Sequence, residues 1–232
     1  MTRPADTGNG TATRPGLRLV SVDYITIALY LGGMGRIAGV TPEETRERLL
    51  DAAARVFELK GYEGATVAQI AREAGVSSGA IYAHYAGKAE LLVDALRAHR
   101  ERAVASVLAQ DGSTDAASLL FALASRLGTR EHEATALLVE ALLASRRDAE
   151  LAQVLAAALG EREQLMAALI GRGQAEGGIS DDVSSETAAR FALMLSLGSM
   201  LVRSLDLPAT DPADWTAFMR RLIDAFTQET TP

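Results

Sequence analysis

Cysteine is absent from this chain of 232 residues, and aromatic residues make up only 5% of it. Without cysteine the chain has no disulfide bonds and no thiolate metal sites, and a reducing cytoplasm suits it. Histidine occurs only three times, and the catalytic signatures H-E-x-x-H and G-x-S-x-G are missing. We therefore expect a cytoplasmic protein that is not an enzyme and that holds no metal and no cofactor.

Two short helical patterns lie on either side of Gly75, Val76 and Ser77. A T-x-x-Q capping box at Thr66 and Gln69 predicts the start of the first helix. Its apolar positions recur at helical spacing: Val67, Ile70, Ala71 and Ala74. Gly75 is expected to take the left-handed conformation that ends this helix, and Ser77 is a good cap for the next.

This spacing predicts a helix-turn-helix, a motif that places its second helix in the major groove of DNA. On the second helix Ile81 is expected to face inward, which leaves small, hydroxyl and aromatic side chains outside. The alternative is an ordinary helical hairpin in a packed core. A hairpin requires neither this spacing nor two exposed tyrosines, Tyr82 and Tyr85.

The segment from residue 43 to residue 92 resembles the DNA-binding domain of the TetR family of transcriptional regulators. The matching run is RERLLDAAARVFELKGYEGATVAQIAREAGVSSGAIYAHYAGKAELL, and its most characteristic part is the aromatic block Tyr82, His84 and Tyr85 with Lys88 after it. The resemblance implies a homodimeric repressor that binds a palindromic operator in double-stranded DNA. It also implies release by a small-molecule effector, expected to be largely apolar.

The expected DNA contacts lie in and around the second helix of the motif. Four residues are expected to contact phosphates, at positions that match backbone contacts in the family: Thr66, Tyr82, His84 and Lys88. The residues expected at or next to base edges are Ser77, Ser78, Gly79 and Ala80. Tyr85 is either a further contact or a structural residue beneath the recognition helix. Arg36 and Arg46 are candidates for additional contacts before the first helix.

The rest of the pattern predicts an all-α protein of about nine helices. The first begins at Thr41, with Pro42 at the first helical position and Glu44 closing a T-x-x-E capping box. Gly61 is expected to end it, after a buried side that includes Leu59. A fourth runs from Lys88 to about Gln110. Five more are expected at roughly 114–128, 132–146, 148–175, 184–206 and 212–228.

These helices divide into a DNA-binding domain at 41–88 and an effector-binding and dimerisation domain at 89–232. Charge follows the same division. Residues 34–110 hold ten basic and ten acidic residues, whereas residues 111–232 hold ten basic and eighteen acidic residues. The acidic part is expected to face away from DNA phosphates.

The last two helices are apolar on most sides and must therefore be covered on most sides. We expect them to form a four-helix bundle with a second subunit, whereas a monomeric core is the alternative. The expected interface residues are Phe191, Leu195, Gly198, Ser199, Val202, Trp215, Phe218, Met219 and Leu222.

Residues 1–40 are expected to be a disordered extension, with the native start at Met34 and an extra DNA-contacting arm as the alternative. The apolar run VDYITIALYLGGMG is shorter than the ~20 residues that cross a bilayer, so no membrane association is expected.

Spacing alone assigns no effector contacts. Polar or soft residues in otherwise apolar helices are the candidates: Arg126, His132, Thr135, Glu140, Gln164, Arg190 and Met194. A helical ligand-binding or scaffold protein that has lost DNA binding is the alternative function.

Overall fold

The described part of the chain is entirely helical. The computed structural model describes residues 41–111, 115–128, 135–205, 207–208 and 210–227. Its elements are α2 (Pro42–Gly64), α3 (Val67–Ala74), α4 (Ser78–Tyr82), α5 (Lys88–Asp111), α6 (Ala116–Ser125), η1 (Arg126–Gly128), α7 (Thr135–Ser145), α8 (Ala149–Ala175), α9 (Ser185–Ser204) and α10 (Pro212–Thr227). The predicted all-α class and the nine α-helices are confirmed for these residues. The prediction for residues 1–40 lies outside them.

Local capping sets the helix starts. The Thr41 hydroxyl accepts from the Glu44 amide at 3.2 Å, and the Glu44 carboxylate accepts from the Thr41 amide at 2.8 Å. This reciprocal pair satisfies two amides that the first turn of a helix leaves unpaired. The predicted capping box at Thr41 is therefore confirmed.

The end of α2 differs in part from the prediction. Gly61 has a φ of 67°, which interrupts the helical backbone, but one further turn continues to Gly64. A residue with a Cβ would be strained in that conformation. Leu59 was expected on the buried side, and that prediction is wrong, because 81% of the side chain is exposed. It lies just before the break, where no other helix covers it.

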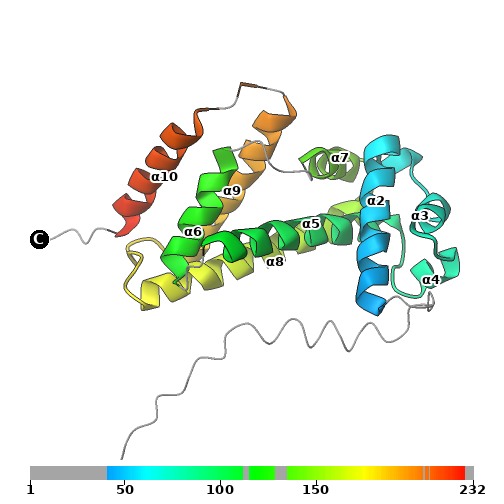
Figure 1. Cartoon of the computed structure of the whole chain (residues 1–232), viewed down its shortest axis with the longest axis horizontal. Helices are drawn as coiled ribbons and strands as arrows, with labels where there is room; N and C mark the ends of the chain where they lie inside the picture. The colour runs from blue at the N-terminus through cyan, green and yellow to red at the C-terminus, as the bar shows by residue number, and fades with distance from the viewer. Residues whose placement is uncertain (1–40, 112–114, 129–134, 206, 209, 228–232) are drawn as a thin grey trace, which may run out of the picture.

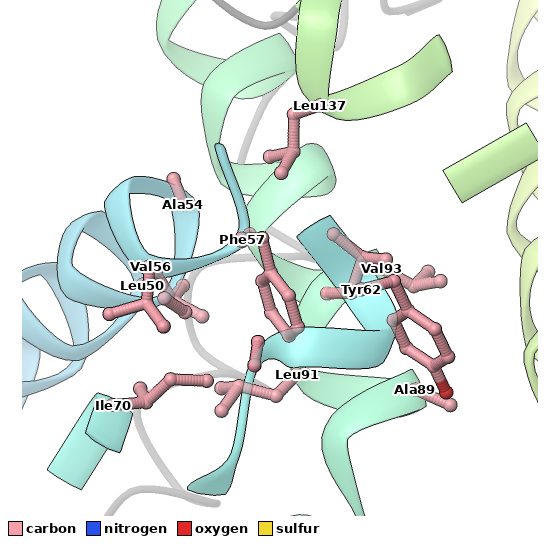
Figure 2. Packing of buried hydrophobic residues seen from close by; sticks show 14 of the residues in the cluster. Leu50, Ala54, Val56, Phe57, Tyr62, Ile70, Ala89, Leu91, Val93 and Leu137 are labelled. Atoms are coloured by element: carbon pink, nitrogen blue, oxygen red, sulfur yellow. The ribbon is translucent and has the colours of Figure 1, made fainter. Parts of the chain in front are cut away.

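One hydrophobic core joins the first helices to the rest of the molecule. Phe57 of α2 stacks on Tyr62 with 6.1 Å between ring centroids, and Leu91 of α5 is fully buried in the same cluster. Figure 2 shows Leu137 of α7 on the far side of Phe57 from Leu91. Helix α2 packs on α7, and α5 packs on both α7 and α8, so these two helices connect the first part of the chain to the rest through packed side chains.

The helices are arranged along one long direction (Figure 1). Helices α2, α3 and α4 gather at one end and α10 lies at the other, while α5 and α8 pack together between them. Helix α9 packs on α8, and α10 packs on α6 and η1. None of the helices in the described ranges is both long and apolar enough to cross a membrane.

Candidate DNA-binding site

Helices α3 and α4 form the predicted helix-turn-helix. Thr66 caps α3, with its hydroxyl 3.2 Å from the Gln69 amide and the Gln69 side chain 3.0 Å from the Thr66 amide. Gly75 ends α3 with a φ of 71°, and the Ser77 hydroxyl accepts from the Ala80 amide at 3.1 Å to start α4. Each of these features was predicted and is confirmed.

The inner and outer faces of the motif are clearly divided. The predicted apolar positions of α3 are all buried, and Ile81 of α4 is buried against them. Tyr82 is 58% exposed, Gly79 is exposed, and Ser78 and Ala80 are half-buried. Helix α4 therefore presents a surface of small residues beside an exposed phenol. That surface lets another molecule approach the helix backbone closely.

The family comparison addresses this segment directly. A model described as "Bacterial regulatory proteins, tetR family" matches residues 49–95, which span most of α2, all of α3 and α4, and the start of α5. Residues 49–95 therefore form a TetR-type domain.

The sequence relatives agree for this domain. The chain is 51% identical over 59 residues to the HTH-type transcriptional regulator SrpR of Pseudomonas putida, which covers 25% of this chain and 28% of that protein. It is 25% identical over 183 residues to the HTH-type transcriptional regulator UidR of Escherichia coli K12, covering 78% and 90%. The chain matches only 28% to 44% of the length of the first curated relatives, SrpR among them.

The fold similarity extends beyond the N-terminal domain. A structure of a putative TetR-family transcriptional regulator from Rhodococcus sp. superposes with a TM-score of 0.65 at 23% identity, covering 80% of this chain and all of that one. The helical C-terminal part thus shares the fold of that TetR-family structure.

Lys88 was expected to contact phosphate, but in this structure its ammonium is held inside the TetR-type domain. The Lys88 Nζ donates to the Tyr62 carbonyl at 2.8 Å and lies 4.3 Å from the centre of the Tyr62 ring. It therefore binds a carbonyl at the end of α2, where backbone oxygens lack helical partners. A phosphate contact by Lys88 stays a prediction, and it would require the ammonium to leave the Tyr62 carbonyl for a phosphate oxygen.

Tyr85 is likewise tied to the protein. Its hydroxyl donates to Asp94 Oδ2 of α5 at 2.7 Å, and Arg46 of α2 donates to both oxygens of the same carboxylate at 2.9 and 2.8 Å. Although burial opposes it, the Asp94 charge raises the pKa of Arg46. These contacts favour the structural alternative for Tyr85. They also occupy Arg46, whereas Arg36 lies outside the described residues.

The two remaining phosphate candidates differ in accessibility. Thr66 is exposed at the start of α3, where the partial positive charge of a helix N-terminus favours an anion. The His84 Nε2 is buried without a hydrogen-bond partner among the described residues. A phosphate contact by His84 therefore needs the ring to rotate outward, and both roles stay predictions.

Three contacts that the sequence did not indicate hold the TetR-type domain together, and the first two of them also join it to the rest of the chain. The Tyr62 amide donates to Glu140 Oε1 of α7 at 2.6 Å, and the Tyr62 hydroxyl donates to Asp148 Oδ2, the N-cap of α8, at 3.0 Å. Burial, together with the hydrogen bond to Asp148, raises the pKa of Tyr62 and keeps the hydroxyl protonated as a donor. Asp94 of α5 supplies the third contact, described above.

Part of the predicted α9 interface forms an uncovered stripe in the single chain together with Met194 and Leu201, whereas the predicted Leu195 and Ser199 are half-buried. Phe191, Met194, Gly198, Leu201 and Val202 are all exposed. The first four of these are spaced by three, four and three residues, which is the pattern of a helix that packs against another helix. A Cβ added at Gly198 would meet nothing within 4 Å. The stripe is therefore open to another molecule.

Helix α10 divides the remaining interface candidates. Phe218 is exposed, whereas Met219 is only 2% exposed and packs inside its own subunit. Trp215 is half-buried, and its indole N–H donates to the Ala124 carbonyl of α6 at 3.2 Å. We accordingly assign Met219 to the subunit core and retain Phe218 as a surface candidate. Within the subunit, α10 packs on α6 and η1.

Proposed function

We propose that this protein is a ligand-responsive transcriptional repressor that binds a palindromic operator as a homodimer. The observation that carries the proposal is the TetR-type helix-turn-helix whose helix α4 presents an exposed Gly79 and Tyr82 beside the half-buried, small Ser78 and Ala80. A helix with small outward side chains can lie deep in the major groove. Ser78 hydrogen-bonds base edges, Ala80 meets a thymine methyl group, and Tyr82 binds phosphate.

Dimerisation is part of the same proposal. One motif contacts few bases, and each wrong base pair costs only about 1–3 kcal/mol. Two motifs held about one DNA turn apart, ~34 Å, add their contacts on a palindrome. The exposed stripe on α9, continued by Phe218 of α10, is the surface that we assign to the partner subunit. Burying it in a four-helix bundle removes large apolar side chains from water.

The link between effector and operator runs through α5. Its first half packs in the TetR-type domain and is held there by Asp94, and its second half packs on α6 and α8. We therefore propose that the DNA-binding domain extends into the first turns of α5 rather than stopping at residue 88. An effector that prefers one position of α5 relative to α8 changes the separation of the two motifs. A coupling of about 1–3 kcal/mol is the usual scale of such effects.

The experiment is selection of double-stranded DNA from a random-sequence pool by the full chain, followed by binding titrations on the enriched site. We expect an enriched palindrome, and we expect Ala80→Glu or Tyr82→Ala to weaken its binding at least tenfold. Glutamate at position 80 places a negative charge against the bases and phosphates, and alanine at position 82 removes a phosphate contact. The matched control is Ala156→Glu, an equal change at an exposed position of α8.

Two results would overturn the proposal. The first is a well-folded protein that enriches no sequence, which would favour a helical ligand-binding or scaffold protein. The second is an operator affinity of both Ala80→Glu and Tyr82→Ala that equals the affinity of the control variant.

A further inference from the structure

Arg162 of α8 is a cation in the interior of the helical domain without a carboxylate partner. Its Nη2 donates to the hydroxyl of Ser196, a buried residue of α9. The carboxylates on either side of it in sequence are already used. Glu161 binds Arg97, and Glu163 binds Arg190 at 2.6 Å. Among the described residues, no acidic side chain lies within salt-bridge distance of Arg162.

A second guanidinium, that of Arg100 on α5, lies close enough to Arg162 to repel it. Burial and then the charge of Arg100 lower the pKa of Arg162 to about 10. Burial also lowers the pKa of Arg100, although Glu101 opposes that shift. A largely buried cation without a carboxylate partner, as Arg162 is, destabilises the empty protein, and the neighbouring charge of Arg100 adds to that cost. Both side chains are half-buried, so each keeps some contact with solvent.

The inner face of α9 carries a further unpaired cation. Arg203 lies seven residues after Ser196, which is about two helical turns or ~10.5 Å along the axis. Its Nη1 donates to the Leu127 carbonyl at 2.8 Å, but its Nε and Nη2 are buried without partners among the described residues. Burial lowers the pKa of Arg203 as well. The nearby helix α6 is almost wholly apolar, with the sequence AASLLFALAS. Positive charge and apolar surface thus occur together in this interior.

We propose that Arg162, Arg100 and Ser196 bind the anionic head group of the effector, a small molecule with a carboxylate or phosphate on an apolar body. The two guanidiniums neutralise the acid group and the serine hydroxyl donates a hydrogen bond to it. The apolar body lies against α6. Because Arg100 belongs to α5 and Arg162 to α8, the bound anion draws together the helix that leads to the DNA-binding domain and the helix that packs on α9. This inference rests on the proposed function only in naming the ligand as the effector.

The test uses the full chain with decanoate, decyl phosphate and decanol as probes, and compares wild type with Arg162→Met. We expect at least one of the two acids to bind wild type with a dissociation constant below 1 mM, and decanol to bind at least tenfold more weakly. The preferred acid then shows whether the site takes a carboxylate or a phosphate. We expect Arg162→Met to lose at least tenfold in affinity for that acid. The matched control is Arg172→Met, an exposed arginine of the same helix α8, and we expect it to bind as wild type does.

Thermal unfolding without ligand separates a binding role from a structural one. If Arg162 is held for an anion, Arg162→Met removes an uncompensated buried charge, and its melting temperature equals or exceeds that of wild type. If Arg162 stabilises the fold, the same change lowers the melting temperature. The inference is overturned by such a lowering, by equal binding of decanol, by unchanged acid binding in Arg162→Met, or by the failure of both acids to bind.

Operator binding is measured separately with the enriched DNA site. Arg162-dependent binding of an acid without any enriched DNA would keep the anion site and refute the proposed regulator. Binding of the operator, combined with acid binding that does not depend on Arg162, would support the proposed regulator and refute the anion site.

Discussion

Asp94 holds together two elements of the DNA-binding domain, and replacing it with asparagine tests how much this contact contributes. Its carboxylate accepts two hydrogen bonds from Arg46 Nη2 and one from the Tyr85 hydroxyl. The Arg46 and Asp94 side chains are only 21% and 16% exposed, so solvent screens the pair weakly. Asp94→Asn retains the shape and one acceptor for Tyr85 but removes the charge opposite Arg46.

The expected loss lies between two known limits. Exposed ion pairs contribute about 0–1 kcal/mol, and removing one partner of a buried pair costs about 3–5 kcal/mol. At about one-fifth exposure, with one hydrogen bond retained, we expect the free energy of unfolding to fall by about 2–3 kcal/mol. For a protein of this size that corresponds to a melting temperature lower by roughly 4–12 °C.

Urea unfolding followed by circular dichroism measures this loss directly. The matched control is Asp51→Asn, which breaks the Arg102–Asp51 pair, also with a short contact of 2.7 Å but with side chains 49% and 37% exposed. We expect the control to lose less than about 1 kcal/mol. Equal losses in the two variants, or a loss below about 0.5 kcal/mol in Asp94→Asn, would refute the argument that burial makes this contact strong.

Two further predictions concern the dimer and the response to acid. Leu201→Glu places a charge on the exposed stripe of α9, and we expect sedimentation velocity to show monomers of this variant. The control is Leu59→Glu, which changes an exposed leucine outside the stripe, and we expect it to remain a dimer. Dimers in both variants would exclude the stripe as the dimer interface. Hydrogen bonds from the Leu151 amide and from the Tyr62 hydroxyl hold the pKa of Asp148 below 3.8. The ionised Asp148 carboxylate therefore stabilises the fold above pH 3.8, and this stabilisation is lost as the pH falls through the lowered pKa. In acid titrations followed by circular dichroism we therefore expect wild type to lose more stability than Asp148→Asn below about pH 4, and parallel curves would contradict the assignment.

Much of the candidate site was predictable because local interactions determine it. Thr66 and Gln69 bond to each other across three residues, and the αL conformation of Gly75 follows from the absence of a Cβ. The helical spacing of the apolar residues of α3 likewise indicates which side is buried. The resemblance of this segment to the TetR family came from the same short stretch of sequence.

The errors and omissions arise where the outcome depends on distant parts of the chain. Leu59 fits the apolar pattern of α2 but lies where no other helix covers it, and Met219 fits a surface stripe but packs inside the subunit. Lys88 has a sequence position that suits phosphate binding, yet its ammonium binds the carbonyl of Tyr62, 26 residues earlier. Periodicity identifies an apolar face, but not which neighbour covers it.

By itself the sequence determined the caps that start α2, α3 and α4, the turn between α3 and α4, and the outward residues of α4. Those features depend on interactions over three to five residues, whose energies are the same in any fold that contains them. Only the tertiary structure decided that Asp94 joins Arg46 to Tyr85, that Tyr62 meets Glu140 and Asp148, and that Arg162 binds Ser196 of α9 rather than a carboxylate. These pairs depend on how whole helices pack, and the packing is set by the sum of many weak contacts along the chain.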